Sequence, residues 1–525
     1  MVVLDGSTLT LAEVNRVARS PEPVELAPVA IQAIDSSRRA VETVVGAGEA
    51  VYGVTTGFGR LSEVAIPQDQ LAQLQRNLVL SHAAGVGPEL STEAVRAAVL
   101  LRANALCRGY SGVRVELVRA LLDLLNAGVT PVVPAQGSLG ASGDLAPLAH
   151  IALVLIGRGS AWYNGERLSG AEALRRAGLV ALELEAKEGL ALINGTQVMT
   201  GIGVLAVDEA RRLLDAADGA AALSMEGLGG QRDALDPRLH AARGHPGQIE
   251  TAAKLSCLLE GSTLTYGHGQ GRIQDAYSLR CVPQVHGAVR DALTYAADVL
   301  EREVNAATDN PLIFPSSPDE DPAQGATAPV FLSGGNFHGQ PVAIALDLAA
   351  IGVATLANIA ERRVERLVNP DLSGLPAFLT RQGGLQSGFM IAQYTAAALA
   401  SENKILASPA SVDTIPSSAN QEDHVSMGTI AARKLAQVVE HSRQVVAIEL
   451  LCAAQAVDLH LEQRGLTDPR RHLGRGTWPI YQQVRDRVPG LTADRELAPD
   501  IQAIAEILKA GNVGQATADA DKEWA

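Results

Sequence analysis

The sequence predicts a mainly α-helical protein organised around a bundle of long helices. Apolar residues recur at the spacing of a half-buried helix in four long segments, residues 287–308, 341–368, 386–406 and 427–461. Alternating patterns that indicate strands are few and short, at residues 2–4, 161–168 and 330–332. Aromatic residues make up only 3% of the chain, so we expect the core to consist mainly of Ala, Leu, Val and Ile. Long helices without an extended sheet favour a bundle.

Capping and proline residues indicate where several helices begin and end. Ser91 is predicted to cap a helix, because its hydroxyl can accept a hydrogen bond from the unpaired amides of the first turn. Asn310-Pro311 and Asn369-Pro370 are predicted to follow the ends of two long helices. Proline cannot continue the helical hydrogen bonds and restricts the residue before it.

The chain divides by these patterns into three regions that we expect to fold as one cooperative unit. Residues 1–200 form an N-terminal region, residues 201–480 the central long-helix bundle, and residues 481–525 a C-terminal helical tail. Residues 315–329 are rich in Pro, Ser and Asp, which predicts an exposed loop with a mobile tip.

Composition and charge argue against several classes of protein. The formal net charge is -15 and the sequence has no basic stripe, so we expect no nucleic-acid partner. The N-terminus lacks the basic and apolar regions of a signal peptide. Residues 341–360 are apolar, but Asp347 and Asn358 interrupt them, which favours a buried bundle helix over a membrane span. We therefore expect no membrane association.

The cysteines indicate a reducing compartment. They are widely separated, without a CxxC pair or a metal-ligand spacing: Cys107, Cys257, Cys281 and Cys452. Scattered thiols are typical of cytoplasmic proteins without disulfide bonds, so we expect a cytoplasmic protein, and the spacing predicts no metal site.

The most informative segment is the glycine-rich stretch 137–150. It admits a structural interpretation, a loop entering a helix with Asp144 as the N-terminal cap, and it lacks the Gly-Lys-Ser/Thr ending of a phosphate loop. A chemical interpretation is also open. The amide nitrogen of Gly143 can attack the carbonyl carbon of Ala141, closing a five-membered ring around Ser142. Loss of two waters would leave an exocyclic methylene, a strong electrophile made without a bound cofactor.

Other separated blocks accompany this segment, at residues 51–59, 81–85, 188–197, 274–280, 334–338 and 421–427. Together the blocks resemble the histidine/phenylalanine ammonia-lyase family, over about Tyr52 to Leu461. The resemblance implies the helical fold of that family and its prosthetic group, 4-methylideneimidazole-5-one (MIO), formed autocatalytically from Ala141, Ser142 and Gly143 without an external cofactor.

The resemblance also implies catalytic roles. Tyr52, in the glycine-rich block 51–59, is similar to the catalytic tyrosine of the family's lid loop. Tyr277 would lie beside the prosthetic group. Glu422 would face the substrate, and whether Tyr52 or Glu422 removes the proton stays open. A phenol is a useful base only where neighbouring cations or helix ends lower its pKa.

Substrate binding is expected to involve a second set of residues: His82, Asn194, Gln274, Arg280 and Phe337. By itself Arg280 would be interpreted as a surface ion pair and Asn194 as a turn residue before glycine. The resemblance makes Arg280 the bidentate partner of the substrate carboxylate and Asn194 a partner of the ring or substrate. Tyr277 and Arg280 are three residues apart, which places them on one face of a helix.

Two blocks favour L-histidine as the substrate. The pair Ser81-His82 and the acidic Glu422 resemble the histidine-specific branch, and a histidine with a carboxylate can recognise both edges of an imidazole. The expected reaction is elimination of ammonia to give trans-urocanate, the first step of histidine degradation. The resemblance further implies a homotetramer with shared active sites. Alternatives are a tyrosine or phenylalanine ammonia-lyase, an aminomutase, or a catalytically silent helical scaffold.

Overall fold

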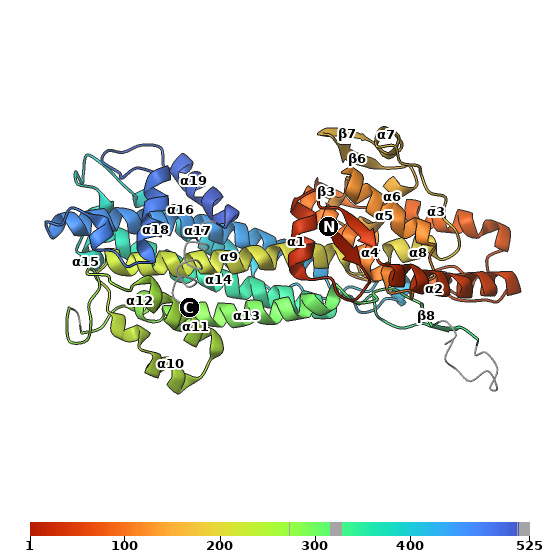
Figure 1. Ribbon diagram of the computed structural model, residues 1–525, viewed down its shortest axis with the longest axis horizontal. Coiled ribbons are helices and arrows are strands. Elements are labelled where there is room, and N and C mark those ends of the chain that lie inside the picture. Colours follow the sequence, from red (N-terminus) through yellow and green to blue (C-terminus); the bar gives the residue numbers. More distant parts are fainter. Residues whose placement is uncertain (272, 315–327, 512, 514–525) are drawn as a thin grey trace. The chain divides into compact units, whose positions relative to one another are not determined.

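The computed structural model describes residues 1–271, 273–314, 328–511 and 513. The chain is mostly helical, as predicted, and forms two compact units (Figure 1). Unit 1 comprises the described residues of Met1–Leu205, Ala297–Asp347 and Pro409–Arg433, and unit 2 those of Ala206–Ala296, Leu348–Ser408 and Lys434–Ala525. Residues 315–327 of the predicted loop lie outside the described residues. The division into three sequence regions stays a prediction.

Unit 1 combines short helices with small sheets. The helices wholly within it are α1 (Leu11–Arg19), α2 (Pro28–Ala47), α3 (Leu71–His82), α4 (Thr92–Cys107), α5 (Val115–Ala127), α6 (Leu145–Leu155), α7 (Gly170–Arg176) and α8 (Glu188–Ile193). Its strands are β1 (Val2–Leu4), β2 (Val24–Leu26), β3 (Val86–Glu89), β4 (Thr130–Pro131), β5 (Pro134–Gln136), β6 (Ser160–Tyr163), β7 (Glu166–Ser169), β8 (Leu312–Phe314) and β9 (Val330–Leu332). β1 pairs with β2 in parallel, and the pairs β3–β5, β4–β6, β6–β7 and β8–β9 are antiparallel.

Helix α4 forms the centre of unit 1, because every residue from Ala94 to Cys107 is buried. It packs against α1, α2 and α5. The Ser91 hydroxyl accepts from the amide of Ala94, so the predicted cap is confirmed. Helix α8 packs against both α3 and α6. This packing gathers the C-terminal end of α8, the C-terminal end of α3 and the loop before α6.

Four long helices contribute residues to both units: α9 (Gln197–Gly227), α13 (Val282–Glu303), α14 (Gln340–Val368) and α17 (Gly428–Gln463). The end of α14 before Asn369-Pro370 confirms that prediction. The predicted end of the 287–308 helix is wrong, because α13 stops at Glu303. The side chain of Thr308 accepts instead from Gln197, and Asp309 and Asn310 are also tied by side-chain hydrogen bonds. These contacts replace the last turn of the expected helix.

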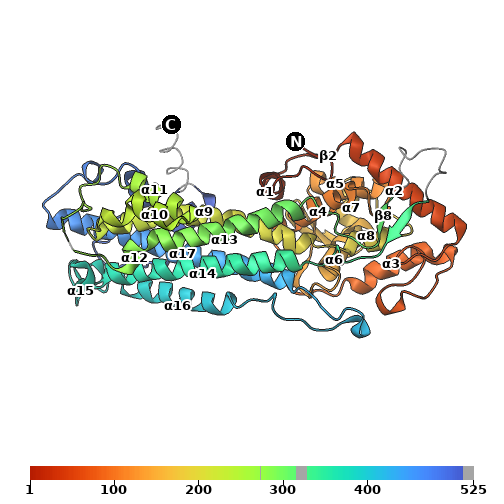
Figure 2. The ribbon, with the colours of Figure 1, turned by 90° about the horizontal axis from the view of Figure 1, so that it is seen from below.

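The elements wholly within unit 2 are helical (Figure 2). They are α10 (Pro237–Arg243), α11 (Pro246–Leu258), α12 (Tyr277–Arg280), α15 (Pro370–Ser373), α16 (Met390–Leu406), α18 (Thr477–Arg487) and α19 (Ala498–Ala510).

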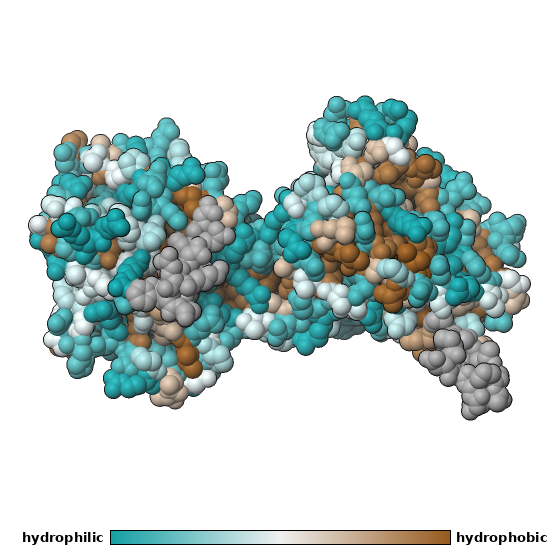
Figure 3. Space-filling model, viewed as in Figure 1, coloured by the Kyte–Doolittle hydropathy of each residue, from teal (hydrophilic) through white to brown (hydrophobic). Residues whose placement is uncertain are grey.

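Helices α14 and α17 are long and apolar enough to cross a membrane by length and composition alone. However, 61% of the most apolar window of α14 and 83% of that of α17 are buried inside the protein. Both therefore behave as core helices, as we expected for residues 341–360. Hydrophilic residues cover much of the surface that each unit presents in Figure 3.

Candidate active site

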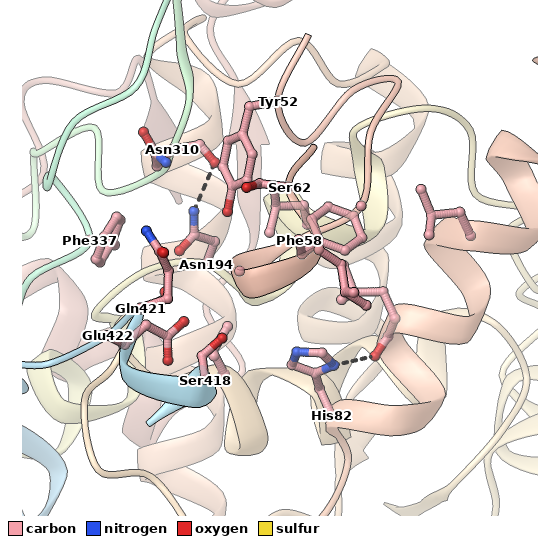
Figure 4. Close-up of a pocket in the computed structure, with 18 of the residues that line it drawn as sticks. Tyr52, Phe58, Ser62, His82, Asn194, Asn310, Phe337, Ser418, Gln421 and Glu422 are labelled. Carbon is pink, nitrogen blue, oxygen red and sulfur yellow. Dashed lines mark hydrogen bonds between the residues drawn. The ribbon is translucent and has the colours of Figure 1, made fainter. Parts of the chain in front are cut away.

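A cavity of about 800 Å³ in unit 1 collects residues from widely separated parts of the sequence. The predicted site residues that line it are Tyr52, His82, Ser142, Asn194, Phe337 and Glu422. Most of their side chains point toward a common space in Figure 4. The fold therefore brings together side chains that are up to several hundred residues apart in the chain.

The loop that carries Ser142 makes a tight turn. Gly140 and Gly143 form an antiparallel bridge across it, and Gly143 also pairs with Gly195. Gly143 has a φ of +77°, and a Cβ at this position would lie 2.2 Å from the carbonyl oxygen of Gly195. Only glycine fits such a contact. The turn therefore packs the backbone of Gly143 directly against that of Gly195.

Asp144 anchors this loop. Its carboxylate is fully buried, and Oδ2 accepts from the backbone amides of Val198 at 2.9 Å and Met199 at 2.8 Å. Oδ1 accepts from the hydroxyls of Ser138 and Thr429. Burial raises the pKa of Asp144 to about 6, although these hydrogen bonds act in the opposite direction. Asp144 occupies the N-cap position of α6, as predicted, but its carboxylate makes no hydrogen bond with the first turn of that helix.

Asn194 follows the last residue of α8 and is buried. Its Nδ2 atom donates to Oδ1 of Asp309 and to the carbonyl oxygen of Asn310, both at 3.0 Å. Figure 4 shows the second bond as a dashed line beside Tyr52. The turn-residue alternative therefore does not describe this asparagine, whose side chain belongs to a buried polar network.

His82, the last residue of α3, presents one defined edge to the cavity. Its Nδ1 lies 2.8 Å from the carbonyl oxygen of Leu78. A carbonyl oxygen only accepts, so Nδ1 carries the hydrogen and Nε2 is left as an acceptor. Burial lowers the pKa of His82, while Glu422 raises it to a lesser extent. A neutral His82 therefore offers an acceptor to a ligand N–H group.

Glu422 is held by a strained turn. Ser418, Ala419 and Asn420 have φ values of 49°, 53° and 69°, a conformation that residues other than glycine seldom adopt. After this turn the backbones of Ser417 and Glu422 pair, and the hydroxyl of Ser417 donates to Oε2 of Glu422 at 2.7 Å. Oε1 is not used in that bond, so it is available to a ligand.

Tyr52 lies in the segment that docks against this turn. Burial raises the pKa of its phenol, a hydrogen bond with the Gly59 backbone lowers it, and the charges of Glu422 and Asp309 raise it further. The net direction is upward. The phenol is therefore protonated near neutral pH in this chain, and the downward shift that a tyrosine base needs is not produced by the groups around it.

Three predicted residues lie in unit 2 and do not line this cavity. Gln274 and Arg280 line a separate pocket of about 550 Å³. Tyr277 is 71% exposed, and the guanidinium carbon of Arg280 lies 4.5 Å from the centre of its ring. The expectation that Tyr277 and Arg280 share one helix face is confirmed by α12. Their assignment to the catalytic centre stays a prediction.

Sequence reasoning missed several polar residues of the cavity, among them Asn310, Ser333 and Ser418. It also missed Lys187 and Asp309, which lie behind Asn194. Asn310 was interpreted only as part of a helix stop. The sequence feature that could have indicated these residues is the polar run 308–310, which follows a long apolar helical segment.

The match to known proteins covers nearly the whole chain. Residues 9–486 match the family model of the aromatic amino acid lyases. The chain belongs to the aromatic amino acid lyase family. As a member of this family it is a carbon–nitrogen lyase with the fold of the histidine and phenylalanine ammonia-lyases.

Individual members of the aromatic amino acid lyase family are also similar to this chain. A histidine ammonia-lyase of Symbiobacterium thermophilum is 58% identical over 508 residues, which cover 97% of this chain and 96% of that protein. The crystal structure of histidine ammonia-lyase from Trypanosoma cruzi matches with a TM-score of 0.89 and 42% identity, covering 99% of this chain and 95% of that one. A tyrosine aminomutase from Streptomyces globisporus matches with a TM-score of 0.91 and 40% identity, covering 99% and 98%. The backbone alone therefore does not separate substrates within the family.

Proposed function

We propose that this lyase eliminates ammonia from L-histidine to give trans-urocanate, the first step of histidine degradation. The observation that carries the proposal is the cavity that Ser142 lines together with His82 and Glu422, two groups able to bind an imidazole. Neutral His82 offers an acceptor through Nε2, and Glu422 offers a carboxylate oxygen. A protonated imidazole ring has two N–H groups that can donate to these two acceptors, whereas a phenyl ring would leave both polar groups without partners. Sequence identity with histidine ammonia-lyases supports the same substrate.

The residues around Ser142 fit the MIO group. Gly143 has the conformation and the close contact with Gly195 that exclude any side chain, and Asp144 holds the loop from its other side. Ala141, Ser142 and Gly143 would form the group without an external cofactor, and when formed it supplies an electrophilic methylidene carbon to the substrate. Asn194 and Phe337 line the same cavity as Ser142.

The chain's own residues would orient the substrate and move its proton. His82 and Glu422 would fix the imidazole, so that the β-carbon of the substrate faces Ser142 and Tyr52. Tyr52 and Glu422 both line the cavity, and both are candidates for the group that takes the β-proton. Binding of the cationic amino group beside Tyr52 would lower the pKa of the phenol, which the free chain holds above its ordinary value.

We further propose a homotetramer in which Arg280, with Gln274, binds the carboxylate in the site of a neighbouring subunit, where Tyr277 would lie beside the prosthetic group. Arg280 lines a pocket on unit 2, and the ring of Tyr277 beside it is 71% exposed. An exposed aromatic ring beside an arginine is typical of residues that contact another subunit.

We propose the cytoplasm as the site of action. Cys107, Cys281 and Cys452 form no disulfide bond within the described residues, and Cys107 and Cys452 are buried. Burial raises the pKa of Cys107 to about 12, so this thiol stays protonated and unreactive. Buried thiols that form no disulfide bond, such as Cys107 and Cys452, suit a reducing compartment.

The decisive experiment is ultraviolet detection of urocanate after addition of L-histidine, with Ser142→Ala assayed in parallel. We expect rapid product formation in the native protein and none in the variant. Intact mass should show the loss of two waters only in the native protein. Product from tyrosine or phenylalanine but not from histidine would show that histidine is not the substrate. It would favour a tyrosine or phenylalanine ammonia-lyase or an aminomutase. Absence of both product and mass loss would favour the remaining alternative, a catalytically silent helical scaffold.

A further inference from the structure

Behind the cavity lies an ion pair between Lys187 and Asp309. The Nζ atom of Lys187 is 2.8 Å from Oδ2 of Asp309, and the two side chains are 0% and 1% exposed. Lys187 has a φ of 73°, a left-handed conformation directly before α8. Burial lowers the pKa of Lys187, and the charge of Asp309 opposes this shift. The chain thus tolerates both a strained backbone and two desolvated charges at this point.

Such a pair is expensive to bury and is weak evidence for stability, because well-packed apolar residues often serve equally well. Its other contacts indicate what it does instead. Oδ1 of Asp309 accepts from Nδ2 of Asn194 at 3.0 Å and from the backbone amide of Asn310 at 2.7 Å. The ion pair is therefore linked directly to a side chain of the cavity.

The amide of Asn194 has its orientation fixed by this link. Nδ2 donates one hydrogen to Asp309 and the other to the carbonyl oxygen of Asn310, so both hydrogens of the amide are used. Oδ1 of Asn194 is buried and has no hydrogen-bond partner within the described part of the chain. Asn194 lines the cavity together with Tyr52 and Ser142. A residue of the cavity wall therefore holds a buried acceptor for which the described part of the chain supplies no donor.

A second cation holds the backbone of the same residue. Nη1 of Arg102 donates to the carbonyl oxygens of Asn194 and Thr308. Burial lowers the pKa of Arg102 to about 10, and Asp309 again opposes the shift. The main chain around Asn194 is thus fixed by Arg102, and the side chain by Asp309.

We infer that Asp309, itself held by Lys187, is a positioning residue that keeps Oδ1 of Asn194 turned toward the substrate as an acceptor for its α-ammonium group. This inference rests on the proposed function, in which the substrate is an α-amino acid. An ammonium group carries three donors and requires acceptors once it leaves water. A rotated Asn194 would present its own N–H group to the cation and repel it.

The test uses Asp309→Asn, Lys187→Met and the double variant. In Asp309→Asn the new amide is able to donate toward Asn194, so the orientation of that side chain is no longer fixed. We expect kcat/KM to fall about tenfold to a hundredfold, the range for a lost hydrogen bond to a charged group. Each single variant also leaves one buried charge without its partner, so the melting temperature should fall.

The double variant separates positioning from stability. It leaves neither charge unpaired, so we expect its melting temperature to recover toward that of the native protein while kcat/KM stays low. A pair with only a structural role would restore activity together with stability, and that result would overturn the inference. Native kcat/KM in a folded Asp309→Asn protein would overturn it as well.

Glu188→Gln is the matched control. Glu188 follows Lys187 directly, is fully buried, and accepts from Arg114 and from the backbone amide of Glu185. We expect a lower melting temperature with unchanged kcat/KM, since this carboxylate does not bind Asn194. Intact mass must be measured for each variant, because a missing loss of two waters would assign the defect to ring formation and overturn the positioning role.

The substrate of the assay is the amino acid that the native protein converts. If the native protein converts tyrosine and not histidine, the proposed function fails. The comparison of the variants then proceeds with tyrosine, because every candidate substrate carries the same α-ammonium group.

Discussion

The hydroxyl of Ser417 donates a 2.7 Å hydrogen bond to Oε2 of Glu422. The same two residues pair through their backbones on either side of a left-handed turn. A carboxylate fixed in this way presents only one oxygen to the cavity, and its direction is set before a ligand arrives.

Ser417→Ala should therefore weaken binding of histidine. Loss of one such hydrogen bond costs about 1 kcal/mol, or about a fivefold rise in KM, with the loss of two waters still present. Steady-state kinetics and intact mass measure both quantities. Ser169→Ala, which removes the cap of α7, is the control and should change stability but not KM. An unchanged KM in Ser417→Ala would show that Glu422 does not bind the imidazole.

Asp144→Ala should abolish formation of the electrophile. The variant loses the acceptor for the Val198 and Met199 amides, so the turn at residues 140–143 is no longer held against α9. We expect intact mass without the loss of two waters, together with no urocanate. Asp236→Ala, which removes a carboxylate cap from α10 in unit 2, should retain the mass loss. Complete dehydration in Asp144→Ala would disprove the anchoring role.

The pH profile decides between the two candidate bases. Glu422 raises the pKa of Tyr52, so Glu422→Gln should lower it. If the phenol is the base, kcat/KM rises as the phenol ionises, and in Glu422→Gln this rise moves to lower pH. Tyr52→Phe should then lose about 10²–10⁴-fold in kcat. If Glu422 is the base, Glu422→Gln should suffer the larger loss and Tyr52→Phe the smaller one.

Shared active sites predict complementation between inactive variants. Tyr52→Phe and Arg280→Met change residues that lie in unit 1 and unit 2. In a mixed tetramer some sites would combine an intact Tyr52 from one subunit with an intact Arg280 from another, so activity should reappear after the two inactive proteins are unfolded and refolded together. Each protein refolded alone is the control. No recovery in mixtures that size-exclusion chromatography shows to be tetrameric would place both residues in the same subunit's site.

Glu226 should make stability depend on pH. Burial raises its pKa to about 7 from 4.5, despite hydrogen bonds from Thr477, Ser262 and the backbone amide of Gly474. The folded state therefore binds a proton more tightly than the unfolded state, and this contribution falls as pH rises from 4.5 to 7. Over this range of pH the free energy of unfolding falls by about 3 kcal/mol in total. Melting temperatures of Glu226→Gln relative to the native protein should rise over this window and level off above it. If the melting temperatures of the two proteins changed in parallel with pH, the raised pKa of Glu226 would be contradicted.

The helical fold could be predicted because it depends on local patterns. The long helices followed from apolar spacing, the cap of α4 from Ser91, and the end of α14 from Asn369-Pro370. The end of α13 was misplaced, because Thr308 and Asp309 gain side-chain partners that only the folded chain supplies. Such contacts join residues more than a hundred positions apart.

From residue types and their order alone we predict which residues react: Ala141, Ser142 and Gly143, with Tyr52, His82 and Glu422 as the accompanying groups. Reactivity of this kind depends on residue type and on the backbone neighbours, which are local. Only the tertiary structure decided their orientation and charge state. In the folded chain the hydrogen of His82 lies on Nδ1, and the pKa of Tyr52 is raised. The side chain of Asn194 is oriented by Asp309, which Lys187 holds in turn. These properties come from burial and from partners distant in sequence, and a one-dimensional pattern contains neither.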